Sequence, residues 1–146
     1  MVCLLYIFMR PINPLPDPKN EEASRILEQS INRFKSGKPF VIGMTGAGGA
    51  GKTTFGNNIV LYYGPENCVS IDLDDYLISR EERGKLEVTG YNPSANKLFE
   101  ARRNIQDLSA GRTVSKPRYD HSTGKVIENE TVPPKQIIVI EGVTTL

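Results

Sequence analysis

The sequence predicts an α/β domain built around a parallel sheet, and three observations support this prediction. Short apolar runs that contain β-branched residues, at 39–45, 68–73 and 136–141, are typical of buried strands. Helical segments separate these runs, and strands that alternate with helices form parallel sheets. A glycine-rich turn links the first of these strands to the helix after it. The 146 residues are about the length of one ordinary domain.

The composition is that of a soluble globular protein, with 38% hydrophobic and 24% charged residues. Lys and Arg number 18 against 17 Asp and Glu, which excludes a polybasic nucleic-acid binder and an acidic tail. The two cysteines, Cys3 and Cys68, are too few for a disulfide framework, and the sequence has no Cys/His cluster that could hold zinc. We therefore expect a cytoplasmic protein without a nucleic-acid partner.

The N-terminal segment begins with an apolar run and a proline-rich stretch. Residues 1–9 (MVCLLYIFM) predict a buried strand or a disordered start. They are far short of the roughly 20 apolar residues that span a bilayer, so no membrane partner is expected. Four prolines within 11–18 predict an extended linker. Residues 20–35 predict a helix, because apolar side chains recur at three- and four-residue spacing and Gly37 follows.

Turn and helix signals define the remaining elements. Residues 52–63 predict a helix that Gly64-Pro65 ends, and the charged residues 74–91 predict a loop with a helical turn around Glu81. A further helix opens at Pro93-Ser94, and 113–132 predicts strands with a turn at 122–124. In that last helix, the side chains expected to face inward and the glycine expected at the C-terminal cap are Leu98, Ile105, Leu108 and Gly111.

Residues 46–53 (GAGGAGKT) match the phosphate-binding pattern G-x-x-x-x-G-K-[ST] in full. Its glycines let backbone N–H groups curl around phosphate oxygens, and the next helix directs its positive N-terminus at them. Lys52 is expected to reach the β- and γ-phosphates, and the Thr53 hydroxyl to bind Mg²⁺. The alternative is a glycine-rich turn that only connects strand and helix. The motif predicts a P-loop NTPase, a three-layer sandwich that binds Mg²⁺ and the phosphates of a nucleotide on Gly46, Ala47, Gly48, Gly49, Ala50, Gly51, Lys52, Thr53 and Thr54.

Three carboxylates, Asp72, Asp74 and Asp75, lie at the end of the second of these strands. In open α/β sheets, ligands bind at the carboxyl ends of the strands, so we expect these acids to face the phosphate loop. A carboxylate there can accept a proton from an attacking hydroxyl or hold Mg²⁺ through water. Asp is also common at turns, so for each of the three a capping role is an equal alternative.

Two further stretches carry candidate chemistry. Residues 137–142 (IIVIEG) have the form of a Walker B strand, whose acid approaches Mg²⁺, although many apolar strands end in a charged residue. Residues 116–124 (KPRYDHSTG) contain a cation, an aromatic ring, a carboxylate and the single histidine of the sequence. Such a set can bind a sugar by hydrogen bonds and stacking. From these residues alone, a polar hairpin turn is the favoured alternative.

Together these motifs resemble the phosphoribulokinase and uridine kinase family. The phosphate loop, LDDY at 73–76, GYNP at 90–93, the KPRYDHSTG stretch and the IEG strand occur in the family's order and approximate spacing. The resemblance runs from about Pro39 to Leu146, and the combination of the loop with PxYDHxTG is more specific than the loop alone. It implies a kinase that uses ATP and Mg²⁺ to phosphorylate a hydroxyl of a small sugar-containing acceptor.

The resemblance also implies roles for individual residues. Asp74 falls on the catalytic base and Lys52 on the phosphate-binding lysine. Thr53 and Glu141 fall on the Mg²⁺ positions, with Asp74 as a third candidate ligand. The positions implied for the acceptor site are Tyr119 on an aromatic residue, His121 on the histidine of the phosphoribulokinase-like motif, and the neighbours Asp75, Tyr76, Arg80 and Arg118.

Three positions depart from the family pattern. Leu77 stands where uridine kinases carry a second aromatic residue and phosphoribulokinases a histidine. Gly124 stands where uridine kinases carry a histidine, and Glu81 where phosphoribulokinases carry an arginine. The acceptor therefore stays open between a nucleoside such as uridine and a pentose phosphate such as ribulose 5-phosphate.

The family's domain continues past the IEG strand into further strands and an arginine-bearing lid, whereas this sequence stops at Leu146. We therefore expect a sheet that is incomplete at the C-terminus, with three core strands and an unpaired edge that would allow a homo-oligomer. On this view residues 1–19 are an N-terminal extension, 20–38 a leading helix and 39–146 the N-terminal part of a P-loop kinase domain. The alternative to a kinase is a nucleotide-binding module or truncated fragment without turnover of its own.

Overall fold

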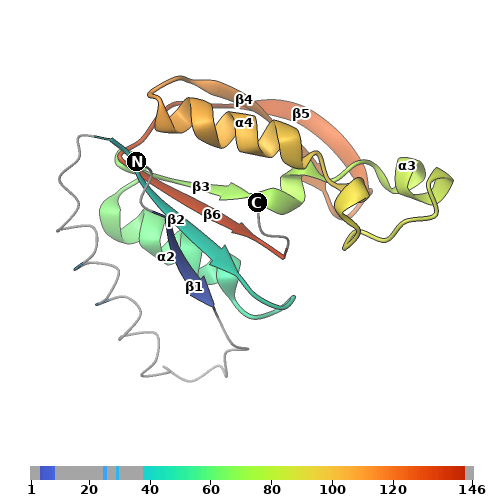
Figure 1. The fold of residues 1–146 in the computed structure, drawn as a ribbon, viewed down its shortest axis with the longest axis horizontal. Helices are drawn as coiled ribbons and strands as arrows, with labels where there is room; N and C mark the ends of the chain where they lie inside the picture. The colour runs from blue at the N-terminus through green and yellow to red at the C-terminus, as the bar shows by residue number, and fades with distance from the viewer. Residues whose placement is uncertain (1–3, 9–24, 26–28, 30–37, 144–146) are drawn as a thin grey trace.

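The computed structural model describes residues 4–8, Arg25, Gln29 and residues 38–143. Its main sheet has four parallel strands in the order β1–β2–β6–β3 (Figure 1). The α/β class with a parallel sheet is therefore confirmed. The bounds of these strands are β1 Leu4–Phe8, β2 Phe40–Thr45, β3 Cys68–Asp72 and β6 Ile137–Gly142.

The first strand, β1, extends the sheet on the outer side of β2. Leu4 pairs with Val41 and Phe8 with Thr45 in parallel register. The strand expected within residues 1–9 is thus confirmed for Leu4–Phe8. The expectation of only three core strands is wrong, because β2 pairs with β1 on one side and β6 on the other. The predicted linker at 11–18 and the helix at 20–35 lie outside the described residues, except that Arg25 and Gln29 are helical.

One face of the sheet is covered by α2, which spans Lys52–Tyr63 as predicted. Phe55 and Ile59, four residues apart, point from this helix into the core. The side chains that form this side of the core are Phe40, Ile42, Met44, Phe55, Ile59, Cys68, Ile137 and Val139.

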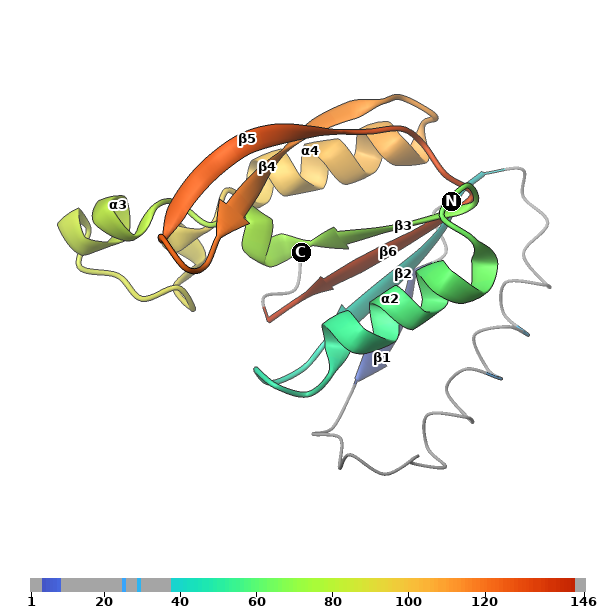
Figure 2. The same ribbon diagram turned by 180° about the vertical axis from the view of Figure 1, so that it is seen from behind.

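The opposite face is covered by the short 3₁₀ helix η1 (Leu73–Tyr76), by α4 (Leu98–Ser109) and by a β-hairpin. The hairpin strands, β4 (Val114–Asp120) and β5 (Lys125–Val132), are antiparallel and form a sheet of their own beside α4 (Figure 2). The molecule therefore has three layers. The core on this side consists of Val41, Ile71, Leu73, Tyr76, Ala101, Leu108, Val114, Val132, Ile138 and Ile140.

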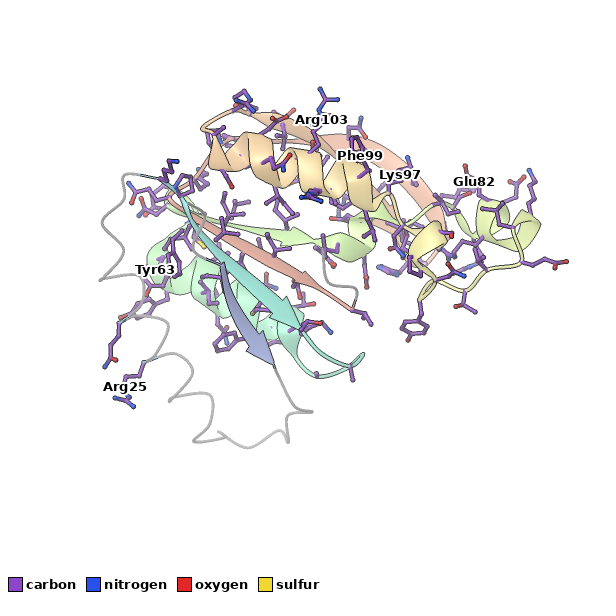
Figure 3. The ribbon with its side chains drawn as sticks, in the orientation of Figure 1. Arg25, Tyr63, Glu82, Lys97, Phe99 and Arg103 are labelled. Carbon is purple, nitrogen blue, oxygen red and sulfur yellow. The ribbon has the colours of Figure 1, made fainter. Side chains whose placement is uncertain are left out.

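The helix expected to open at Pro93 is divided in two. Pro93–Ala95 forms a 3₁₀ turn, η2, and α4 begins only at Leu98. The Lys97 N–H donates to the Tyr76 carbonyl (2.8 Å), which holds the intervening residues out of a helix. Within α4, Leu108 is buried, and Leu98 and Ile105 are half-buried. The outward face carries Phe99 and Arg103, and Lys97 precedes the helix (Figure 3).

The helical turn expected around Glu81 is α3 (Arg80–Lys85), which lies at the outer end of the molecule (Figure 1). A reciprocal capping box starts it, in which Ser79 and Glu82 each bind the backbone N–H of the other. Across the residues that the structure describes, no helix combines the length and apolar character needed to cross a membrane.

Candidate active site

The phosphate loop joins β2 to α2 and leaves its backbone accessible. Ala47, Gly48 and Gly49 are exposed, while Ala50 is buried beneath them. Gly49 and Gly51 adopt positive φ angles of 76° and 83°, which glycine accepts without strain. The first turn of α2 contains no acid, and no side chain caps it. Its N–H groups are therefore available to an anion.

The Lys52 side chain packs against the phosphate loop. Its ammonium Nζ donates to the carbonyl oxygens of Gly46 and Ala47, both at 3.0 Å. Only 8% of the residue is exposed. These carbonyl contacts hold the ammonium beside the phosphate loop.

Two acids lie side by side at the carboxyl ends of neighbouring strands, next to the loop. Asp72 of β3 is the register partner of Glu141 in β6, and Glu141 is also paired with Met44 of β2. Glu141 is only 3% exposed. Burial raises the pKa of its carboxyl, and the charges of Asp72 and Asp74 raise it further.

The Thr53 hydroxyl and the Glu141 carboxylate fit a site for Mg²⁺. The Thr53 hydroxyl lies near enough to lower the pKa of Glu141, and together with the nearby Lys52 charge it counteracts the rise caused by burial. Mg²⁺ prefers oxygen ligands and takes most of them from water and substrate phosphates, so one or two protein groups suffice. Among the described residues, no three His, Cys, Asp or Glu side chains gather as a metal site. The donor set therefore suits an ion carried by a nucleotide.

The three acids after β3 have different partners. The Asp72 carboxylate accepts from the Asp74 N–H (2.8 Å) and caps η1, and burial raises its pKa. The Asp75 carboxylate accepts from the Tyr119 N–H (3.0 Å) and pairs with the Lys116 ammonium. Within the described part of the chain, the half-buried Asp74 carboxylate accepts no hydrogen bond. Asp74 is thus the acid that remains free for chemistry.

The end of the β4–β5 hairpin brings aromatic and basic groups together. Tyr119 is 6% exposed, and its hydroxyl accepts from Arg83 Nη2 (2.8 Å). The rings of Tyr119 and His121 meet edge to face, with centroids 5.0 Å apart. His121 is exposed, and its carbonyl oxygen accepts from Arg80 Nη2 (3.1 Å). His121 and Arg80 therefore form the accessible part of this group, supported by Tyr119.

Two other residues expected at the acceptor site have different surroundings. Tyr76 is fully buried, and its hydroxyl accepts from Asn104 (3.1 Å), so it belongs to the core and not to an open pocket. Arg118 is exposed while its neighbour Tyr119 is buried, so the two point to opposite sides of β4.

The sequence interpretation gave no individual role to Arg83, Tyr91 and Lys116, although Tyr91 and Lys116 lie in the GYNP and KPRYDHSTG motifs. Arg83 binds both the Ile78 carbonyl oxygen (2.6 Å) and Tyr119. Tyr91 is 70% exposed and reaches the phosphate loop, since a Cβ placed on Gly48 would lie 3.9 Å from its hydroxyl. Its place in the GYNP element was a signal that could have identified it. The contacts of Arg83 and Lys116 join distant segments, for which the sequence holds no local signal.

Comparison with known proteins places the chain in a family. The model of the phosphoribulokinase/uridine kinase family matches residues 41–146. Phosphoribulokinase of Synechocystis sp. is 36% identical over 107 residues, which cover 73% of this chain and 32% of the relative. Uridine kinase of Clostridium perfringens is 33% identical over 115 residues, which cover 75% of this chain and 54% of the relative.

A solved structure of a possible uridine kinase from Bacillus stearothermophilus has the same fold. It superposes with a TM-score of 0.69 at 23% identity, over 85% of this chain and 71% of that one. The chain thus spans about half of the uridine kinase and a third of the phosphoribulokinase that it matches in sequence. On the match across residues 41–146, which includes the phosphate loop, the free Asp74 and the hairpin, the chain belongs to the phosphoribulokinase/uridine kinase family.

Proposed function

We propose that this protein transfers the γ-phosphoryl group of Mg-ATP to a hydroxyl of a small sugar-containing acceptor. The free carboxylate of Asp74 is the observation that carries the proposal. It lies close enough to Glu141 to influence the pKa of that buried acid, and Glu141 in turn contacts Thr53 of the phosphate loop. A proton acceptor beside a phosphate site is the arrangement that phosphoryl transfer to a hydroxyl requires.

The chain's own groups would divide the work. The loop N–H groups and Lys52 would hold the phosphates, once Lys52 Nζ leaves the carbonyl oxygens that it now contacts. Asp74 would take the proton of the acceptor hydroxyl. At the same time the hydroxyl oxygen would bond to the γ-phosphorus, and the bond between the γ-phosphorus and the bridging oxygen would break to release ADP. Thr53 and Glu141 would hold Mg²⁺, which when bound offsets charge on the phosphates.

The acceptor would lie between Asp74 and the exposed end of the hairpin. His121 and Arg80 are accessible there, and both can bind oxygens of a sugar or a phosphate. These groups are compatible with a nucleoside such as uridine and with a pentose phosphate such as ribulose 5-phosphate. Both classes occur in the names of the sequence relatives.

A nucleotide-binding module without turnover is the second candidate. It is favoured by the phosphate loop, whose exposed backbone and neighbouring Lys52 can bind a nucleotide whether or not an acceptor is bound. In this case the phosphate loop would bind ATP, and a further polypeptide would be needed for transfer.

The test combines the purified chain with Mg²⁺, γ-labelled ATP and either uridine or ribulose 5-phosphate. We expect ADP and phosphorylated acceptor in equal amounts. Asp74→Asn should keep the affinity for ATP and lower turnover by about 10²–10⁴-fold, because the proton acceptor is lost. Lys52→Ala should lose both binding and transfer, and Lys85→Ala, at an exposed lysine of α3, should lose neither.

The outcomes separate the two candidates. ATP binding with no product from either acceptor favours the module, and full turnover by Asp74→Asn contradicts the role of Asp74. If the reading frame continues past the codon for Leu146, the same assay on the longer product shows whether added residues restore transfer.

A further inference from the structure

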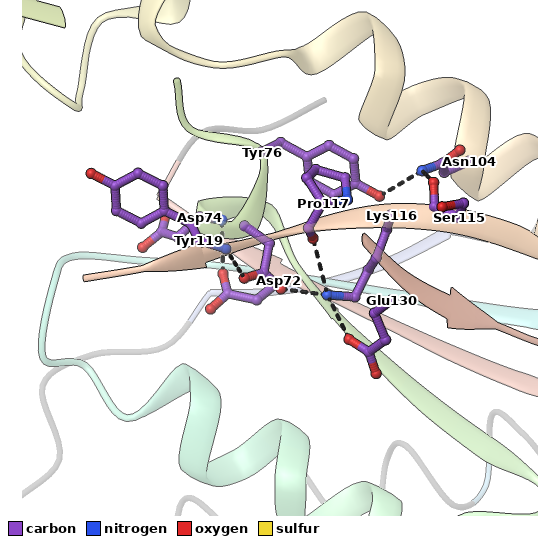
Figure 4. A network of polar contacts seen from close by, with 10 residues as sticks. Asp72, Asp74, Tyr76, Asn104, Ser115, Lys116, Pro117, Tyr119 and Glu130 are labelled. Atoms are coloured by element: carbon purple, nitrogen blue, oxygen red, sulfur yellow. Dashed lines mark hydrogen bonds and ion pairs between the residues drawn. The ribbon is translucent and has the colours of Figure 1, made fainter. Parts of the chain in front are cut away.

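An ion pair between a buried lysine and a half-buried aspartate joins the turn after β3 to the hairpin. The Lys116 ammonium of β4 lies 2.5 Å from Asp75 Oδ2 of η1, and Asp75 Oδ1 accepts from the Tyr119 N–H at 3.0 Å (Figure 4). Lys116 is only 4% exposed. One carboxylate therefore binds two points on β4, three residues apart, from the element that also carries Asp74.

Lys116 also holds the second strand of the hairpin. Its Nζ lies 3.1 Å from Glu130 Oε2 of β5 and 3.5 Å from the Pro117 carbonyl oxygen (Figure 4). The register of the hairpin shifts between Lys116 and Arg118, so the pair lies at an irregularity of the strand. The contacts of Lys116 thus fix both hairpin strands relative to η1.

Hydrogen bonds from an uncharged side chain of α4 also connect η1 to the hairpin. The Asn104 amide donates to the Tyr76 hydroxyl (3.1 Å) and to the Ser115 carbonyl oxygen (3.2 Å). This set ties the end of η1 to the start of β4. The ion pair and the amide together leave η1 little freedom to move against the hairpin.

The pair is not suited to bind a substrate. Lys116 is covered by protein, and both oxygens of Asp75 have partners. Removing two charges from water is costly, and a well-packed apolar pair of similar size often gives equal or greater stability. An ion pair at this position is therefore better explained by the geometry that it fixes than by the stability that it adds.

We propose that Asp75 and Lys116 are positioning residues that set the distance between the Asp74 carboxylate and the acceptor side of the hairpin. Asp74 and Asp75 are consecutive in η1, and Lys116 and Tyr119 lie in one strand. The contact between Asp75 and Lys116 therefore also fixes the position of Asp74 relative to Tyr119. The inference rests on the proposed function, because the consequence of this geometry is that an acceptor hydroxyl meets Asp74.

The experiment compares Asp75→Asn, Lys116→Met and the double variant with the wild type in the assay above. We expect each single variant to raise the acceptor KM at least tenfold and to leave the ATP KM within twofold. The single variants should melt at a lower temperature than the wild type, and the double variant should melt near the wild-type temperature. Its acceptor KM should stay as high as in the single variants. A surface control is Asp107→Asn, which removes a similar Asp–Arg112 contact at the end of α4 and should change neither constant.

Two results would overturn the inference: a double variant with the acceptor KM of the wild type, or ATP and acceptor KM values that rise together. Hydrogen exchange of the Tyr119 amide gives a readout that does not depend on turnover. Its protection should fall at least tenfold in Lys116→Met and Asp75→Asn but not in Asp107→Asn. If the wild type transfers no phosphoryl group, the proposed function fails, and unchanged exchange in the single variants would still refute the positioning role.

Discussion

Asp72, Asp74 and Asp75 lie within four residues of one another, and each carboxylate has different surroundings. Asp72 caps η1, Asp75 is paired with Lys116 from the hairpin, and Asp74 accepts no hydrogen bond from the residues that the structure describes. The sequence could identify the group but not separate its members, because the partner of Asp75 is 41 positions away. The choice of Asp74 from family resemblance agrees with the geometry, and its catalytic role remains a prediction.

The Ser70 hydroxyl is a buried polar group with no hydrogen-bond partner among the described residues. It lies in the seam between β3 and α2, 3.3 Å from the position that a Cβ on Gly56 would occupy. An unpaired buried hydroxyl costs about 1–3 kcal/mol, so we expect Ser70→Ala to raise the free energy of unfolding by about 1 kcal/mol. Urea denaturation measures this gain.

The control for Ser70 is Ser115→Ala, at an exposed position of β4. That change should stay within about 0.5 kcal/mol of the wild type, as surface substitutions usually do. A loss of stability in Ser70→Ala would mean that the hydroxyl has a partner which the contacts above do not include.

At the scale of elements, local sequence signals predicted the helix bounds that depend on nearby residues. They missed the bounds and positions that depend on contacts with distant segments. The bounds of α2 follow from the phosphate motif before it and Gly64-Pro65 after it. The start of α4 was predicted several residues too early, because the Lys97 N–H bonds to Tyr76 across the fold. The same limit applies to the hairpin, which was predicted as strands but not as a layer over the main sheet.

The glycine of the IEG strand has a structural reason that the sequence did not reveal. A Cβ on Gly142 would lie 2.8 Å from Leu73 Cβ, because the end of β6 packs directly on η1. We expect Gly142→Ala to lower the free energy of unfolding by about 1–3 kcal/mol, as overpacking does. Denaturant unfolding followed by circular dichroism measures the change.

Gly84→Ala is the matched control, since a Cβ there meets nothing within 4 Å and the residue lies within α3. It should be neutral or add about 0.4–1 kcal/mol. Equal effects of the two alanines would show that the contact with Leu73 relaxes without cost.

For the molecule as a whole, the sequence predicted the layers and the edge of the sheet at which the site lies. Strand–helix alternation predicted the parallel sheet. The rule for carboxyl ends of strands and the Walker B pattern predicted acids at the end of the sheet where the phosphate loop starts, and Asp72 and Glu141 are paired at that end. The position of β1 next to β2 could not be predicted, because parallel neighbours are selected by packing between segments far apart in sequence. The acceptor residues were the least predictable, since their exposure depends on which side of β4 each one faces.

Asp72, Asp74 and Glu141 lie close together at this edge of the sheet, so the stability of the whole molecule should depend on pH and on a bound ligand. Because burial raises the pKa of Glu141, its carboxyl favours folding most when protonated, and that contribution is lost as the pH rises through its raised pKa. We therefore expect Glu141→Gln to melt at a higher temperature than the wild type at pH 7. The difference should shrink as the pH falls through the raised pKa toward the ordinary value near 4.5.

Saturating Mg-ATP should raise the melting temperature of the wild type more than that of the variant. If Glu141 holds the ion, its loss should weaken Mg-ATP binding about tenfold or more, so that ligand stabilises the variant by about 1.4 kcal/mol less than the wild type. Thermal unfolding at pH 7 and pH 5, with and without Mg-ATP, measures both effects, and Glu81→Gln on the exposed side of α3 is the control. A variant that melts below the wild type at both pH values without ligand would show that the favourable influence of Thr53 and Lys52 on Glu141 outweighs the cost of the buried charge. A variant stabilised by Mg-ATP as strongly as the wild type would remove Glu141 from the metal site.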